Sequence, residues 1–470
     1  MAAPYAKRRK ADVRESQSVL QRIVHSGRCS NVALKNIIRT LRDSNARLEL
    51  LGDNAIRTAS SARARSMAIR IEMPLVGTDR TFGWELLDPC RLLAESVAAS
   101  PFLQGLIASS LRDRPCDFER QWRMVIAFDE FAPGNKLKVD NMRKCMVLSF
   151  SFLEFGRHLR SEKVWFTPVV IRSTKLHAID GGWPACLRNY MLRHCFSAGG
   201  ILTAGIPLVV QGRDVLLFAS VTNLLTDGDG HRVAMDWKGA SSMKPCVKHF
   251  NVLRKRSDLT HRGGGFVEIS SCEFDAFQPW STNDACDCMQ LLILSHERVL
   301  AGTTTAAAHH KLEMAIGLNI NRLGLLADRE LAVKLDIINC VTYDWVHNTF
   351  QDGTFVVEAS ELLSRAARHG VNFRELEAWL RDDRWHFRGA DRIKAKQLHR
   401  IFDHWRAPSN DEAVRLRGSA SEMYSLYGML CHFLETRCSF NAIAAVSFRV
   451  ALNASRSGQT ATNRCWSTLS

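Results

Sequence analysis

The amino-acid sequence predicts an α/β protein whose mixed β-sheet is interrupted by a long, mainly helical insertion. Three β-branched and aromatic runs, WRMVIAFDEF, KCMVLSFSFLEF and VWFTPVVIR, follow one another with turn residues between them, as consecutive strands do. A helical pattern that ends at Gly199-Gly200 comes next, and a strand-like stretch begins at Gly205. From 355 to 406 apolar residues recur at helical spacing, which indicates the insertion.

Composition and charge limit the classes of partner. A chain of 470 residues, 46% hydrophobic and 24% charged, is long enough for two or three domains with cores. The formal net charge of +15 and the pI near 9.4 favour a polyanion, and nucleic acid is the first choice. No run of about 18 apolar residues occurs, so a membrane partner is not expected. The 14 cysteines lack the dense spacing of a disulfide scaffold, which favours reduced thiols inside the cell.

Residues 1–70 are expected to form a helical, basic N-terminal region. Apolar spacing between 14 and 44 predicts two short helices joined by a Ser-Gly-Arg turn, either a DNA-docking helix-turn-helix or an ordinary hairpin. The basic run KRRK is a nuclear import signal, a phosphate-contacting arm or a solvated tail. An Arg-rich linker closes the region, and a connecting helical segment is expected over 71–118.

Acidic residues end two of the predicted strands. The segment VIAFDEFAPGN carries Asp129 and Glu130 before a Pro-Gly-Asn turn, and the later stretch ends in TDGDG with Asp227 and Asp229. A lone acid at a strand end usually only begins a turn, because its side chain bonds the nearby backbone. Carboxylates that converge instead require a divalent cation, and oxygen ligands suit Mg²⁺ or Mn²⁺.

The order of the elements resembles a ribonuclease H-like fold, in which three strands, a helix, a fourth strand and another helix follow one another. Acids on the first and fourth strands of that fold lie side by side, and Asp129 and either Asp227 or Asp229 take these places. The segments FDEFAPGN, FLEFG with WFTPVVIRS, and TDGDGHRVAMDWKGASSMKPCVKHFNVL together resemble cut-and-paste DDE transposases of the CACTA and plavaka type. The resemblance spans about 120–436 and is that of a divergent or truncated copy.

The resemblance implies a catalytic core over 119–244 that is completed by a helix at 411–438. A site for two Mg²⁺ or Mn²⁺ ions is implied, with three carboxylates as ligands: Asp129, Asp227 and Glu422. Glu358 and Glu361 are alternatives for the third acid, and Asp229 for the second.

An insertion over 245–410 with two pairs of further ligands is also implied. Cys246 and His249 stand where the family has a Cys-x2-Cys pair, and Asp344 and His347 fit its Asp-x2-His pair. Such ligands bind Zn²⁺ and would staple the insertion to the core. The structural alternative is a buried thiol and a hydrogen bond from His347 to Asp344 within one helical turn.

Basic residues that flank the acids are expected to hold a phosphate backbone, a salt-sensitive interaction. Solvated loop charges are the alternative. The residues are Lys136, Lys138, Arg143, Lys144, Lys238, Lys244 and Lys248.

The resemblance therefore implies a nuclear, DNA-binding, transposase-like enzyme that cuts or transfers DNA strands by a two-metal reaction. Two alternatives stay open: a catalytically inactive, transposon-derived DNA-binding protein, and a non-enzymatic α+β interaction scaffold. A polar tail over 439–470 has little periodicity, which agrees with a truncated copy. Homo-oligomer formation is also left open.

Overall fold

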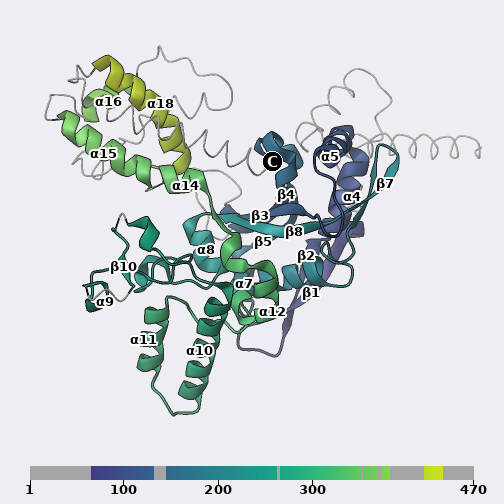
Figure 1. Cartoon of the computed structure of the whole chain (residues 1–470), viewed down its shortest axis with the longest axis horizontal. Helices are drawn as coiled ribbons and strands as arrows, with labels where there is room; N and C mark the ends of the chain where they lie inside the picture. The colour runs from purple at the N-terminus through teal and green to yellow at the C-terminus, as the bar shows by residue number, and fades with distance from the viewer. Residues whose placement is uncertain are drawn as a thin grey trace, which may run out of the picture. The chain divides into compact units, whose positions relative to one another are not determined.

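A mixed five-stranded β-sheet carries the acids that end the predicted strands. In the computed structural model its strands lie in the order β11-β8-β3-β4-β5 (Figure 1). Their bounds are β3 Trp122–Phe131, β4 Cys145–Phe152, β5 Phe166–Arg172, β8 Ala219–Thr226 and β11 Val341–Tyr343. The predicted α/β class with a mixed sheet is confirmed.

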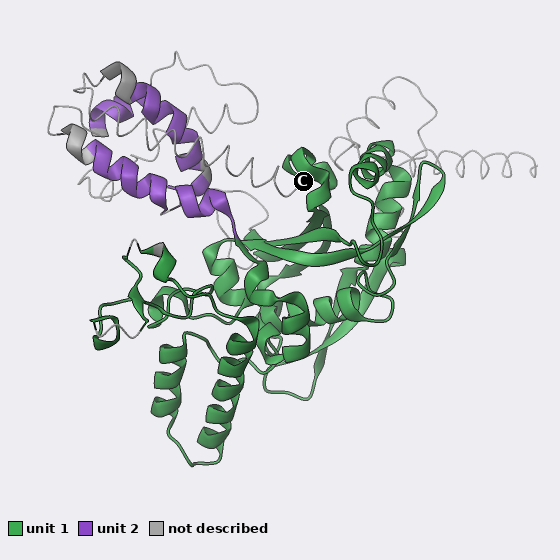
Figure 2. Ribbon diagram, viewed as in Figure 1, with its two compact units in different colours: residues 1–342 green, residues 343–470 purple. Residues whose placement is uncertain are grey.

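The structure describes residues 65–131, 144–261, 265–271, 273–351, 353–367, 373–381, 416 and 418–437. The helices predicted between 14 and 44 and the tail over 439–470 lie outside these residues. The chain divides into two compact units, residues 1–342 and 343–470 (Figure 2). Of the insertion expected over 245–410, the part up to 342 belongs to the same unit as the strands β3, β4, β5 and β8.

The three consecutive strands predicted from the β-branched runs are β3, β4 and β5, and both of their pairings are antiparallel. One face of β3 is buried along its length, by side chains that alternate along the strand as Trp122, Met124, Ile126 and Phe128. The other face holds smaller side chains, among them buried Val125 and also Ala127 opposite Ser149, whose hydroxyl lies 2.7 Å from that of Thr167. The largest apolar side chains of the buried part of β3 therefore lie on one face of the strand.

Between β5 and β8 the chain forms a helix and a hairpin. Helix α7 (Gly182–Met191) agrees with the predicted helical pattern, and a short π-helical turn (Leu192–Phe196) extends it. The stretch that was expected to be one strand is instead three: β6 (Ile206–Val210), β7 (Arg213–Leu217) and β8. Gln211 and Gly212 both have positive φ, as the two central residues of a tight hairpin turn require, and this turn separates β6 from β7.

Two capped helices precede the sheet. Asp88 and Ser100 accept hydrogen bonds from the first turns of α4 (Pro89–Ala99) and α5 (Pro101–Asp113), which both begin with proline. The expected helical segment over 71–118 is wrong in its first part, because β1 (Ala68–Pro74) and β2 (Thr81–Leu87) form an antiparallel hairpin there. Within the described residues no single helix is long and apolar enough to span a membrane; α4 and α5 pass that test only as a pair bent by 106°.

The rest of the first unit, as far as the structure describes it, contains short elements and a helical hairpin. Helix α8 (Gly228–Ala234) follows β8 directly, and the hairpin pairs α10 (Thr282–Leu300) with α11 (Ala306–Ile316) (Figure 1). The shorter elements are α6 (Ser173–Leu176), β9 (Val252–Leu253), α9 (Asp258–His261), β10 (Val267–Glu268), α12 (Arg329–Leu335) and α13 (Ile337–Cys340).

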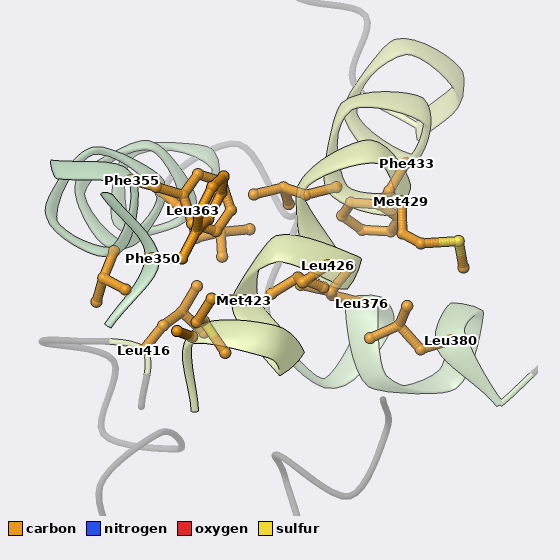
Figure 3. Close-up of a cluster of buried hydrophobic side chains, with 14 residues drawn as sticks. Phe350, Phe355, Leu363, Leu376, Leu380, Leu416, Met423, Leu426, Met429 and Phe433 are labelled. Atoms are coloured by element: carbon orange, nitrogen blue, oxygen red, sulfur yellow. The ribbon is translucent and has the colours of Figure 1, made fainter. Parts of the chain in front are cut away.

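The second unit is helical in its described part. Its helices are α14 (Trp345–Phe350), α15 (Thr354–Ala367), α16 (Phe373–Leu380) and α18 (Ala420–Arg437). Each helix contributes side chains to one apolar cluster, in which Phe350, Leu363, Leu376 and Leu426 are buried (Figure 3). The helical spacing that the sequence shows after residue 355 is confirmed for α15 and α16, because their apolar positions are the ones that fill this cluster.

Candidate functional site

The pairing of β3 with β8 brings Asp129 and Asp227 to the same end of the sheet. The two strands are parallel, with Ile126 opposite Leu224 and Ala127 opposite Leu225. Two residues further along stand Asp129, inside β3, and Asp227, directly after β8. Neighbouring strands lie about 4.8 Å apart, and residues in register project to the same face. The carboxylates of these two residues therefore come from adjacent positions of the sheet edge.

The two aspartates after β8 have different roles in the local backbone. Asp227 is the N-cap of α8, and its Oδ1 accepts a hydrogen bond from the Gly230 amide at 2.6 Å. Asp229 lies in the first turn of that helix, where its side chain is 84% exposed and forms an ion pair with Arg232 at 3.1 Å. Asp227 continues the strand and Asp229 faces solvent, so the register favours Asp227 as the partner of Asp129.

A buried histidine lies next to this strand end. His231 of α8 is fully buried, and its Nε2 lies 3.0 Å from the carbonyl oxygen of Thr342. Its ring also contacts Phe128 of β3, the residue before Asp129. Burial lowers the pKa of His231, although the hydrogen bond to Thr342 and the charge of Asp227 act in the opposite direction. The sequence prediction did not include His231; its position four residues after Asp227 was the available signal.

Glu130, which follows Asp129, is held by two side chains. Its carboxylate accepts hydrogen bonds from Ser173 Oγ at 2.5 Å and from Lys144 Nζ at 2.9 Å. Burial raises the pKa of Glu130, but these two hydrogen bonds and the charge of Lys144 outweigh it, and the net shift is downward. Glu130 is therefore not merely a turn residue, as the sequence allowed.

The third candidate acid, Glu422, lies in the second unit. The Ser419 amide donates to Glu422 Oε2 at 2.8 Å, and Ser419 Oγ lies 2.9 Å from the same oxygen. The Glu422 amide donates to Ser419 Oγ in return, at 3.4 Å, which makes a reciprocal capping box at the start of α18. Glu358 and Glu361, the alternatives, are exposed on α15. The structure brings Asp129 and Asp227 together in the first unit, and Glu422 belongs to the second.

Replacing Glu422 by alanine is expected to lower the free energy of unfolding of the second unit by about 1 kcal/mol, because one half of the capping box is lost. Denaturant unfolding followed by far-UV circular dichroism measures this. Glu358→Ala is the control, since Glu358 is an exposed residue within α15. An equal loss in both variants would contradict a special role of Glu422 in the helix start.

In each of the two pairs expected to bind Zn²⁺, the two side chains contact each other. Cys246 Sγ lies 3.2 Å from His249 Nδ1 in the first unit. Asp344 caps α14 in the second unit, and His347 Nδ1 lies 2.5 Å from its Oδ2, which is the structural alternative drawn from the sequence. These donors suit Zn²⁺ in type. Among the described residues, however, no group of three or more His, Cys, Asp or Glu side chains is arranged to hold a metal ion.

Three of the four described lysines that were expected at a phosphate backbone contact groups of the protein. Lys144 donates to Glu130, and Lys238 Nζ donates to Asn319 Oδ1 at 2.7 Å and lies 3.2 Å from Glu313. Lys244 Nζ lies 5.7 Å from the ring centre of Trp280, and burial lowers the pKa of Lys248. The remaining three residues lie outside the described residues: Lys136, Lys138 and Arg143.

The arrangement suits a hard divalent cation in its donor type. Two carboxylates on adjacent parallel strands offer oxygen ligands, as Mg²⁺ and Mn²⁺ prefer, but a two-metal site needs at least one further carboxylate. No protein-family model matches the chain, and no curated protein matches its sequence. A functional assignment must therefore rest on the residues themselves.

Proposed function

We propose that the protein is a transposase-like, DNA-binding enzyme with a ribonuclease H-like core, which cuts or joins DNA strands with the help of two divalent cations. The register of β3 and β8 carries this proposal, because it sets Asp129 and Asp227 at neighbouring positions of one sheet edge. The strand order supports it as well. Three antiparallel strands follow in sequence, and β8, which comes after the helix and the β6–β7 hairpin, pairs in parallel with the first of them.

In this proposal Asp129 and Asp227 are ligands of the cations. When bound, the cations activate a water or a 3′-hydroxyl and stabilise the charge that develops on the phosphate. The N-cap bond from Gly230 to Asp227 fixes the direction of that side chain before any cation arrives. The positive net charge draws the polyanionic substrate, and a DNA substrate in turn implies a nuclear location.

A DNA-binding protein without a cutting centre is the second candidate. Two observations favour it: the Glu422 carboxylate is engaged in a capping box, and Lys144 and Lys238 donate hydrogen bonds to protein groups. A non-enzymatic scaffold is the third candidate. A scaffold that contacts no DNA phosphates releases no counterions, so its retention on DNA would not depend on salt.

Nicking of a supercoiled plasmid tests the proposal. The full-length protein is expected to nick in Mn²⁺ and not in EDTA, whereas Asp129→Asn and Asp227→Asn nick no more than the EDTA control, because each variant removes a charged ligand. Asp229→Asn is the matched control, since Asp229 is solvent-exposed and paired with Arg232. A wild type that binds DNA in a salt-sensitive way without nicking would favour the second candidate, and nicking that survives in Asp129→Asn would refute the proposed site.

A further inference from the structure

The carboxylate of Glu130 joins three segments at the edge of the sheet. Oε1 accepts from Ser173, the first residue of α6, and Oε2 accepts from Lys144, the residue before β4. A backbone hydrogen bond of 2.9 Å from the Ser173 amide to the Lys144 carbonyl oxygen closes the same junction. These hydrogen bonds connect the end of β3 to the start of β4 and to the end of β5.

The environment of this junction strengthens these hydrogen bonds. Ser173 is buried, and the side chains of Glu130 and Lys144 are 37% and 35% exposed. An ion pair on an open surface contributes little to stability, whereas a hydrogen bond to a charged group contributes more than one between neutral groups. The junction is thus a local clamp.

The clamp acts on the residue next to it. Successive side chains of a strand point to opposite faces, so Glu130 is anchored from one face while the carboxyl group of Asp129 projects from the other. Asp129 still pairs with Val147 of β4, and Glu130 with Met146, close to the end of the ladder. Strand ends fray readily, because ordering the backbone there costs conformational entropy that few contacts offset.

We propose that Glu130, together with Lys144 and Ser173, is a positioning residue that holds the end of β3 so that Asp129 stays beside Asp227. This inference rests on the proposed function, because it gives the clamp a purpose at the cation site. It also assigns Lys144 to the clamp instead of to the DNA backbone. Groups that orient metal ligands typically change metal affinity 10-fold to 100-fold when removed.

Calorimetric titration of the full-length protein with Mn²⁺ tests the inference. Glu130→Ala is expected to bind Mn²⁺ about 10-fold more weakly than the wild type. The double variant Glu130→Lys with Lys144→Glu is expected to recover most of the affinity, because it restores the ion pair with the charges exchanged. Glu330→Ala is the matched control, since it removes a comparable Glu–Lys pair from α12 and is expected to leave the affinity unchanged.

Hydrogen exchange of the backbone amides of residues 128–131 measures the clamp without any metal. These amides are expected to exchange at least about 10-fold faster in Glu130→Ala than in the wild type or in Glu330→Ala, because the strand end opens more often. Unchanged exchange would overturn the clamp. Faster exchange with unchanged Mn²⁺ affinity would overturn its role at the site. A wild type that binds no Mn²⁺ at all would instead refute the proposed function, and the exchange result would still decide whether the clamp exists.

Discussion

Replacing Glu154 by alanine is expected to lower the free energy of unfolding of the first unit by about 3–5 kcal/mol, the usual cost of removing one partner of a buried ion pair. Glu154 lies in the 3₁₀ segment Leu153–Arg160, and its side chain is only 1% exposed. One carboxylate oxygen lies 3.1 Å from Arg123 Nε and 3.4 Å from Arg114 Nη1, and the other accepts from the Arg123 amide at 3.0 Å. Alanine would leave the mostly buried guanidinium of Arg123 without this carboxylate.

Urea unfolding monitored by tryptophan fluorescence measures the effect of Glu154→Ala. The control is Glu162→Ala, because Glu162 is exposed and its removal is expected to change the free energy of unfolding by less than about 0.5 kcal/mol. Glu154→Gln keeps the shape but removes the charge, so its cost is expected to lie between those of the two alanine variants. A loss below about 1 kcal/mol for Glu154→Ala would show that the two arginines find other partners.

The second large expected effect is a dependence of the free energy of unfolding on pH, and it comes from Asp236. This residue follows α8 with a left-handed backbone, φ 54°, and its Oδ1 accepts from Asn321 Nδ2 at 2.9 Å. Its Oδ2 is buried and has no hydrogen-bond partner among the described residues. Gly324 lies so close that a Cβ there would be 2.3 Å from Oδ2. Burial raises the pKa of Asp236 to about 7, and the hydrogen bond from Asn321 offsets this only in part.

The direction of the pH dependence follows from this raised pKa. Between the ordinary pKa of 3.8 and about 7, the folded protein binds the Asp236 proton more tightly than the unfolded chain does. The contribution of Asp236 to the stability of the folded protein is therefore greatest below pH 3.8, and it falls as the pH rises to about 7. The full change is on the order of 4 kcal/mol, at about 1.4 kcal/mol for each pH unit.

Asp236→Asn isolates this contribution, because an amide of similar shape does not ionise. The variant is expected to gain stability relative to the wild type as the pH rises from 4 to 8, in denaturant unfolding at each pH. Asp229→Asn, at an exposed position, is expected to follow the wild type throughout. A difference between Asp236→Asn and the wild type that stays constant over this pH range would contradict the assignment.

Local sequence patterns predicted most of the sheet. The runs that became β3, β4 and β5 and the helix α7 were readable, because burial of alternate or helically spaced residues leaves a period in the sequence. The hairpin of β1 and β2 was missed, although β1 alternates the apolar residues Ile69, Ile71 and Met73 with exposed Arg70 and Glu72, the period of a half-buried strand. The hairpin of β6 and β7 was merged with β8 because its turn, Gln211-Gly212, is short.

For the site, the sequence by itself determined which residues end the strands: Asp129 after a buried β-run, and Asp227 before a helix it can cap. Tertiary structure alone decided that these two stand in adjacent parallel strands and that Glu130 bonds to Lys144 and Ser173. The physical reason is the sequence separation over which each interaction acts. Periodicity, caps and turns depend on neighbours within a few residues, whereas register and ion pairing depend on segments that meet only when the chain has folded.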